Sequence, residues 1–350
     1  MPEDNETIEY RVAIREAIAA EMERDETVVF FGEDVAAAGG VFAVTPGLDE
    51  RFGSERVFDT PISELAMAAG AFGAAVTGLR PVFEIMFADF LPLTMDSLIN
   101  QAAKYWFVSN EQASCPLVVR SAMGAGGNFG AMHSQSPIPW LQGIPGLKVV
   151  APATAGDAKA LLRQSIRDDN PVAFLEHKRL YSVKDPVTDD EVLPLGKAAV
   201  VREGTDVTLV SISKGVRDCL RAADELSERG VSAEVVDLRS LRPLDVETVL
   251  NSVAKTNRVV IVEEGPLIGG WGANLLGIVA AEGLHDLDDA WTIACPETPI
   301  PYSPTLEDAF IPSEGRIGMR IVKSAKPVRK EKVEATRARP VDATMARSAA

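Results

Sequence analysis

The chain has little cysteine and no long apolar run. Only Cys115, Cys219 and Cys295 occur among 350 residues, and their wide spacing gives neither a CxxC metal pair nor a disulfide framework. We therefore expect three reduced thiols. No stretch approaches the roughly 18 consecutive apolar residues of a membrane span. The N-terminus is acidic before any apolar stretch, unlike a secretory leader, so a cytoplasmic location is expected.

Basic residues are also scarce. The formal net charge is −16, which argues against nucleic acid as a partner because phosphate binding requires a basic surface. From Lys323 onward there are eight Lys and Arg against three Asp and Glu, so this tail carries about +5 and residues 1–322 the remaining −21. A hydrophobic content of 46% with 25% charged residues is typical of a globular protein and supplies a sizeable core.

A chain of this length predicts two domains. The first is expected over 7–180, because helical patterns alternate there with short apolar strands, which is typical of a parallel α/β sheet. Its predicted helices are 9–25, 47–53, 63–78, a long one near 89–109, and 154–169. Its predicted strands are 28–35, 56–60, 80–86, 115–122, 147–152 and 171–177, with a glycine-rich loop at 124–130.

A second α/β domain is predicted over 196–322, after a linker over 181–195 that is rich in Pro, Asp and Lys. Its expected strands are 206–213, 232–241 and 258–265, and its expected helices are 216–229 and 246–256. The basic segment 327–350 has almost no large apolar residues and is predicted to be disordered.

Of the three histidines, only His133 lies in a setting that suggests catalysis. It stands in GAGGNFGAMHSQ, a glycine-rich loop that follows a predicted strand, and ligands bind at such loops in parallel α/β folds. A structural or surface role is the ordinary alternative for a single loop histidine. His177 ends a predicted strand and His285 lies among aspartates, so both are expected to be structural.

Glu64 begins a predicted helix whose body, LAMAAGAFGAAVTG, is almost wholly small and apolar. A helix-start acid favoured by the dipole, with Ser63 or Thr60 as the cap, would explain it. Alternatively, a helix that is apolar all round must be buried, and an unpaired carboxylate at its mouth is then costly and needs a proton-sharing partner.

Phe87 and Phe90 flank Asp89 at a strand-to-helix junction. Such aromatics are usually core, but one of them could form a flat wall for a planar ligand. The glycines of the 124–130 loop do not predict nucleotide binding, because the sequence has no GxxxxGK[ST] and no GxGxxG that follows a strand and opens a helix.

Many segments together resemble one family, the E1 β subunits of 2-oxo acid dehydrogenase complexes. They are FGEDVA (31–36), DTPISE (59–64), GLRPVFEIMFADF (78–90), INQAAK (99–104), HSQS (133–136), PGLKVVAP (145–152), DAKALL (157–162) and IRDDNPVAFLEH (166–177). VTLVSIS, VVDLRSLRPLD (235–245) and VVIVEEG (259–265) resemble the transketolase C-terminal domain. The resemblance implies two parallel-sheet α/β domains, a thiamine-diphosphate pyrimidine-binding domain followed by a transketolase C-terminal-like domain.

The resemblance also implies roles for single residues. Glu64 would share a proton with N1′ of the thiamine diphosphate aminopyrimidine, which favours the tautomer whose 4′ nitrogen takes the proton from C2. Phe90 would stack on the aminopyrimidine ring, and Met86 matches another position near the cofactor. His133 would manage protons during acyl transfer to the lipoyl arm.

Two metals and two partners are implied in the same way. A potassium ion is held in some relatives near the positions of Leu117, Ser165, Ile166, Asp168 and Asn170. For Asp168 and Asn170, a helix C-terminal turn before Pro171 is an equal alternative. The family's GDG motif for diphosphate and magnesium lies on the α subunit and does not occur here. An α2β2 heterotetramer is therefore expected, with the acidic second domain docking a basic segment of the E2 lipoyl acyltransferase.

The resemblance leaves the substrate open. Oxidative decarboxylation of a 2-oxo acid, with pyruvate as the first expectation and branched-chain acids as an option, is followed by reductive acylation of E2 lipoyl groups. Acetoin dehydrogenase is the rival within the family. A scaffold subunit without chemistry is the rival of another class, and the presence of Glu64, Phe90 and His133 together argues against it.

Overall fold

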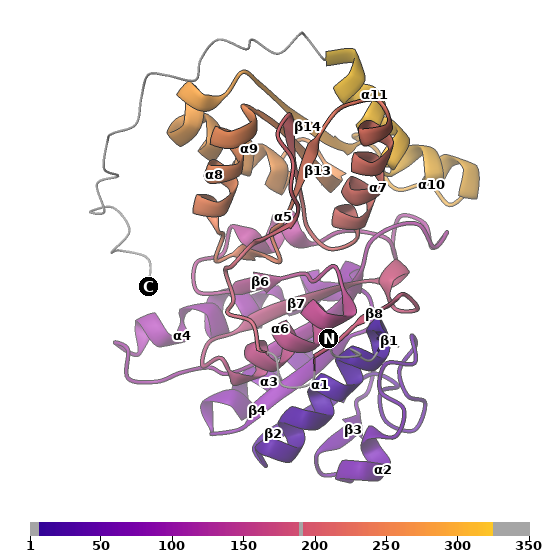
Figure 1. Ribbon diagram of the computed structural model, residues 1–350. Helices are drawn as coiled ribbons and strands as arrows, with labels where there is room; N and C mark the ends of the chain where they lie inside the picture. The colour runs from indigo at the N-terminus through magenta and orange to yellow at the C-terminus, as the bar shows by residue number, and fades with distance from the viewer. Residues whose placement is uncertain (1–6, 189–191, 325–350) are drawn as a thin grey trace, which may run out of the picture.

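The computed structural model describes residues 7–188 and 192–324, which form two layered α/β units (Figure 1). The N-terminal unit is built on a seven-stranded sheet of order β12-β6-β7-β5-β4-β2-β3. Its neighbours are parallel except for β12 against β6. The strands are β2 (Val28–Gly32), β3 (Val57–Asp59), β4 (Arg80–Ile85), β5 (Val118–Met123), β6 (Lys148–Val150), β7 (Val172–His177) and β12 (Ser240–Arg242).

Helices cover both faces of this sheet. Alternation along β2 shows why, since Val28 and Phe30 face one core cluster and Val29 and Phe31 face another. The helices α1 (Tyr10–Arg24) and α6 (Ala155–Arg167) pack together in the first cluster. The second cluster contains α3 (Glu64–Val76), the 3₁₀ helix η1 (Ala88–Thr94), the π-helical η2 (Asp96–Ala102) and α4 (Ala103–Val108).

The C-terminal unit has a five-stranded sheet of order β14-β13-β10-β11-β9, parallel except for β9 against β11. Its strands are β9 (Ala199–Arg202), β10 (Val207–Ser211), β11 (Ala233–Asp237), β13 (Arg258–Pro266) and β14 (Asp289–Cys295). One face carries α7 (Lys214–Glu228) and α11 (Glu314–Ser324), and the other carries α8 (Val246–Thr256) and α9 (Trp271–Gly283) (Figure 1). The prediction of two α/β units with mainly parallel sheets is confirmed.

Smaller elements complete the described chain. They are β1 (Thr7–Glu9) paired with β8 (Lys184–Pro186), α2 (Leu48–Phe52), α5 (Ile138–Gln142), η3 (Lys178–Leu180), η4 (Leu284–Asp286) and α10 (Pro304–Phe310). The range predicted as a linker thus contains β8. The segment 327–350, predicted to be disordered, lies outside the described residues.

Two predicted elements are wrong in form. The long helix expected near 89–109 is divided into η1, η2 and α4, and Pro92 lies inside η1, where it has no N–H for a helical hydrogen bond. The single strand expected over 232–241 is also divided. Arg239 has φ +57°, which turns the chain between β11 and β12, and β12 then joins the sheet of the N-terminal unit through Ser240 opposite Val150.

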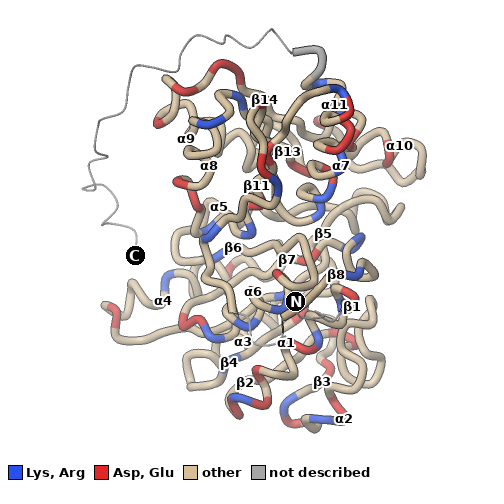
Figure 2. The backbone as a smooth tube through the Cα atoms, viewed as in Figure 1, with Lys and Arg blue, Asp and Glu red and all other residues tan. Residues whose placement is uncertain are grey.

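The two units share a core. One hydrophobic cluster runs from Phe83 of β4 through Val149 of β6 to Val236 of β11 and Trp271 of α9. Cys115, Cys219 and Cys295 are buried and unpaired, as expected. Figure 2 shows acidic and basic residues interspersed on both units. Over the described ranges, no helix combines the length and apolar character needed to cross a membrane.

Candidate active site

Most of the residues singled out in the sequence lie at one edge of the seven-stranded sheet. Glu33 follows β2, Glu64 begins α3 after β3, and Phe87 follows β4. The loop with His133 follows β5, and His177 is the last residue of β7. Because these five strands are mutually parallel, their carboxyl ends meet at the same edge. Ligands bind at such edges in open α/β sheets.

Two buried carboxylates stand near each other at this edge. Glu33 and Glu64 are each only 8% exposed. Burial raises the pKa of the Glu33 carboxyl, and the negative charges of Glu64 and then Asp34 raise it further. Oε1 of Glu33 is buried without a hydrogen-bond partner in the described chain. Oε1 of Glu33 therefore has acceptor capacity to offer a ligand beside Glu64.

The helix behind Glu64 differs from expectation in two ways. Neither predicted cap acts as one, because Ser63 makes no side-chain cap hydrogen bond and the Thr60 hydroxyl lies 2.8 Å from Sδ of Met67. α3 is also buried on one face only in this chain. Leu65 is 56% exposed and Ile62, just before the helix, is 84% exposed. An apolar helix surface therefore remains uncovered.

Aromatic rings enclose the histidine predicted to be catalytic. The imidazole of His133 meets the rings of Phe87 and Phe90 edge-on, with centroids 4.8 and 5.5 Å apart. Phe87 also contacts Phe42 and Phe129. Because α3 packs against η1, which contains Phe90, the carboxylates and this ring cluster belong to neighbouring elements. Met86 lies half-buried just before them.

A buried lysine that no sequence motif singled out holds the His133 loop. Nζ of Lys178 donates to the carbonyl oxygen of His133 and lies over the rings of Phe87 and Phe129. Burial lowers the pKa of Lys178 to about 8, although Asp89, Glu264 and Glu307 oppose this shift. The lysine is therefore a cation whose charge depends on these carboxylates.

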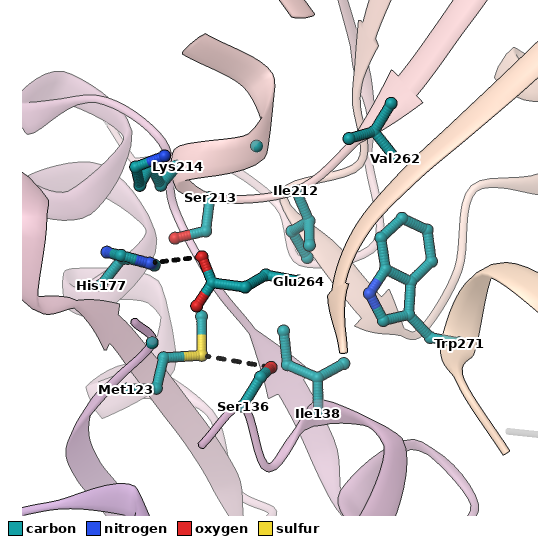
Figure 3. Close-up of a pocket in the computed structure, with 12 residues that line it drawn as sticks. Met123, Ser136, Ile138, His177, Ile212, Ser213, Lys214, Val262, Glu264 and Trp271 are labelled. Carbon is teal, nitrogen blue, oxygen red and sulfur yellow. Dashed lines mark hydrogen bonds and ion pairs between the residues drawn. The ribbon is translucent and has the colours of Figure 1, made fainter. Parts of the chain in front are cut away.

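A histidine–carboxylate pair joins the two units beside the same loop (Figure 3). His177 lies 3.1 Å from Oε2 of Glu264, and Nδ1 of His177 accepts the N–H of Arg179. This pattern places the proton on Nε2, which donates to Glu264. Gly124 packs directly on the ring, since a Cβ there would lie 2.2 Å from Nε2 of His177. His177, the last residue of β7, and the loop after β5 therefore fit together only with glycine at position 124.

Glu264 also bonds the loop. Its Oε1 accepts the N–H of Ala125 at 2.6 Å. Burial alone would raise the pKa of the Glu264 carboxyl, but His177, Lys214 and the Ala125 N–H lower it to about 2. Figure 3 shows Glu264 between His177 and Ser213, with Trp271 at the far side of the narrow cavity that these residues line. A larger cavity of about 550 Å³ adjoins it, lined by residues 134–136 of the loop, by 264–266 and by 295–300.

Four of the five residues of the predicted potassium site lie at the end of α6 and in the turn after it, with Leu117 just before β5, and the oxygens of Leu117, Ser165, Ile166 and Asp168 already have partners. The carbonyls of Ile166 and Asp168 both accept from Arg80, and the Asp168 carboxylate accepts from Lys148. The Leu117 carbonyl accepts from Val172 N–H, and the Ser165 carbonyl accepts from Asp168 N–H. Asp168 caps α6 and its Oδ1 accepts the Asn170 N–H, as in the alternative of a helix C-terminal turn. Arg80 and Lys148 thus already balance the negative charge of this turn.

Among the described residues, no three His, Cys, Asp or Glu side chains are grouped to hold a metal.

The fold and the site define a transketolase-like chain. Residues 6–184 match the model of the transketolase pyrimidine-binding domain, and residues 196–317 match that of the transketolase C-terminal domain. A solved split-gene transketolase, described as an inactive β4 tetramer, shares the fold with a TM-score of 0.72. It is 21% identical, and the match covers 91% of this chain and 98% of that one.

Within that class, the chain belongs to the family of E1 β subunits of 2-oxo acid dehydrogenase complexes, which confirms the resemblance. It is 45% identical to the acetoin:2,6-dichlorophenolindophenol oxidoreductase β subunit of Bacillus subtilis, over 87% of this chain and 93% of that one. It is 44% identical to the 2-oxoisovalerate dehydrogenase β subunit of the same organism, over 88% and 95%. It is also 44% identical to the pyruvate dehydrogenase E1 β subunit of Rickettsia felis, over 89% and 96%. Membership in this family supports thiamine diphosphate as the cofactor.

Proposed function

We propose that this chain is the β half of an E1 component that uses thiamine diphosphate to decarboxylate a 2-oxo acid, pyruvate in the first place, and to acylate the lipoyl group of an E2 acyltransferase. The observation that carries the proposal is the arrangement at the sheet edge, where the Glu33–Glu64 carboxylates and the His133–Phe90 ring contact lie on neighbouring elements. A scaffold subunit would have no need for a buried carboxylate pair, which costs free energy of folding.

The residues present suit the cofactor. Thiamine diphosphate supplies, when bound, a nucleophilic carbon and an electron sink for cleavage next to a carbonyl. Glu64 would accept a hydrogen bond from the protonated ring nitrogen of the aminopyrimidine, and Glu33 beside it would favour the protonated state through its own charge. Phe90, half-buried, would offer a flat surface to the ring, and Met86 would line the site.

His133 would handle the proton of the acyl-transfer step. Its imidazole lies nearly perpendicular to the rings of Phe87 and Phe90, which hold the imidazole by apolar contact. The apolar surroundings favour loss of carbon dioxide, because a carboxylate that water would stabilise is discharged there.

The proposal assigns the diphosphate and its magnesium ion to an α subunit. The exposed apolar face of α3, with Leu65 beside Ala66, Ala69 and Gly70, would bury against that partner, and a Cβ added at Gly70 would meet nothing in this chain. Small residues allow close backbone approach between helices. We infer an α2β2 heterotetramer, with E2 as its further partner.

Acetoin cleavage is the second candidate. The relatives named for acetoin, from Bacillus subtilis and Cupriavidus necator, are 45% and 43% identical, and those named for pyruvate or 2-oxoisovalerate are 44% identical. These sequence identities do not distinguish acetoin from the 2-oxo acids as the substrate. The cytoplasmic location and the potassium ion also stay predictions. A melting temperature that rises in potassium but not in sodium would establish the ion.

The test is co-expression with an E1 α subunit, followed by assays with thiamine diphosphate and magnesium on pyruvate, branched-chain 2-oxo acids and acetoin, with 2,6-dichlorophenolindophenol as acceptor. Activity is expected only in the mixture. In the assembled enzyme, Glu64→Gln should lower turnover by roughly 100-fold or more, because proton sharing with the cofactor is lost. The matched control is Glu50→Gln, an exposed acid in the first turn of α2, which should change little. Activity of this chain alone, or near-normal turnover of Glu64→Gln, would refute the proposal.

A further inference from the structure

The loop that carries His133 has no regular secondary structure between β5 and α5, so its shape depends on a few hydrogen bonds. Inside the loop, Gly124 N–H donates to the Gln135 carbonyl and His133 N–H to the Gly130 carbonyl. Asp89, from the same unit, accepts from the backbone and side chain of Gln135. These contacts fix the two ends of the loop, whereas in the stretch 125–130 the N–H groups of Ala125 and Asn128 find their acceptors in the other unit.

That stretch is held by two carboxylates of the C-terminal unit. Glu264 at the end of β13 accepts the N–H of Ala125 at 2.6 Å, and Glu307 of α10 accepts the N–H of Asn128 at 2.8 Å. The two pairs are separated by 139 and 179 residues along the chain. Hydrogen bonds from N–H groups to ionised carboxylates are about twice as strong as neutral ones. The C-terminal unit therefore shapes a loop of the N-terminal unit.

Each carboxylate is itself held in place. His177 donates to Glu264 from Nε2 (Figure 3). Gly124 packs on the His177 ring itself, so the ring is held by both contacts. Glu307 is only 1% exposed, and its other oxygen has no partner among the described residues. Lys178, whose Nζ donates to the His133 carbonyl, supplies the cation that balances this group. A buried acid with only one hydrogen-bonded oxygen costs free energy of folding, and its presence here indicates that Glu307 serves to position the loop.

We propose that Glu264 and Glu307 are positioning residues for His133. They clamp the 124–136 loop, keep the imidazole against Phe87 and Phe90, and thereby set the rate of the step that His133 serves. This inference rests on the proposed function for the identity of that step, which is acyl transfer to the lipoyl group. It gives the C-terminal unit a part in the chemistry of a site whose predicted residues all lie in the N-terminal unit.

The test compares Glu264→Ala and Glu307→Ala in the assembled enzyme with wild type. Two rates are measured, decarboxylation with 2,6-dichlorophenolindophenol and acylation of an isolated lipoyl domain. We expect lipoyl acylation to fall about tenfold or more, which corresponds to roughly 1.4 kcal/mol for a lost positioning hydrogen bond, while decarboxylation changes much less. Glu264→Gln and Glu307→Gln, which keep an acceptor oxygen for Ala125 and Asn128, should recover most of the loss. Asp308→Ala, at the exposed neighbour of Glu307 on α10, is the matched control.

A second measurement does not depend on activity. Amide hydrogen exchange of peptides covering 124–136 should become about tenfold faster in Glu264→Ala and Glu307→Ala but not in Asp308→Ala. Adding either variant to His133→Ala should cause no further loss of lipoyl acylation. Unchanged exchange, or equal losses in both rates, would overturn the positioning role. If His133→Ala by itself left acylation normal, the proposed function of His133 would fail instead, and the exchange result would still decide whether the two acids hold the loop.

Discussion

Replacing Arg120 by methionine should destabilise the N-terminal unit severely. Arg120 is 1% exposed on β5 and bonds three carboxylate oxygens at 2.7 Å, two of Glu176 on β7 and one of Glu84 on β4. It therefore links the three central strands whose carboxyl ends carry Phe87, the His133 loop and His177. Methionine fills much of the same volume but leaves two buried carboxylates without a cation.

The magnitude follows from those two acids. Glu84 and Glu176 are 7% and 0% exposed, so neither recovers its solvation by turning to water. At about 1–3 kcal/mol for each unsatisfied buried group, the loss is about 2–6 kcal/mol, and removing one partner of a buried ion pair costs about 3–5 kcal/mol. The hydroxyl of Tyr181 still donates to Glu176, which places our expectation near 4 kcal/mol.

Urea denaturation of the purified chain, followed by circular dichroism, measures this loss as a lower midpoint with an unchanged slope. The control is Arg202→Met, whose partner Asp224 is exposed, with an expected loss below about 1 kcal/mol. Burial raises the pKa of the Glu84 carboxyl and Arg120 opposes this shift, so the loss of Arg120 raises that pKa further above its unfolded value. The variant's deficit is then small below the unfolded value, about pH 4, and grows as the pH rises through the folded value. A loss under about 1 kcal/mol at pH 8, or a loss that does not depend on pH, would refute this account of the network.

Three further outcomes are expected. His133→Ala should impair lipoyl acylation more than decarboxylation with an artificial acceptor, and equal losses would contradict that division. Gly124→Ala should lower stability by about 1–3 kcal/mol in urea denaturation, because φ is +93° and the new Cβ would strike His177; a neutral effect would show that the loop can move away. Asp237→Asn should flatten the pH dependence of stability. Burial and the charge of Asp157 raise the pKa of Asp237 to about 7. The contribution of Asp237 to the free energy of unfolding is therefore full below about pH 4 and falls by on the order of 4 kcal/mol as the pH rises to 7. An unchanged pH profile of the unfolding midpoint would count against this prediction.

Local patterns in the sequence predicted most elements, and contacts distant in sequence account for the errors. The small-residue run predicted a helix over 63–78, and α3 spans Glu64–Val76, because its boundaries depend on local composition. β12 could not be separated from β11 by any local pattern, because its place in the other sheet depends on Val150, 90 residues earlier. Long-range pairing of this kind leaves no periodic signal in either segment.

The same distinction between local patterns and distant contacts explains which residues of the candidate site could be predicted from the sequence. His133 could be selected because a glycine-rich loop after a strand marks an edge of the sheet, and Glu64 because an acid before an apolar helix is unusual. Glu33 follows a buried strand in the same way, and this signal could have found it. Glu307 carried no signal, because its importance arises only from contact with Asn128, 179 residues away.

The contacts between the two units also determine where a substrate can enter. Opening them would separate Glu264 from His177 and Glu307 from Asn128, pull β12 from β6, and expose the shared core around Trp271. Each buried charge that lost its partner would cost about 1–3 kcal/mol, and burial of the apolar side chains would be lost as well. A hinge within this chain is therefore too costly to operate in each turnover. Under the proposed assembly, in which a partner covers the exposed Ile62 and Leu65, the motions that admit substrate therefore belong to that partner.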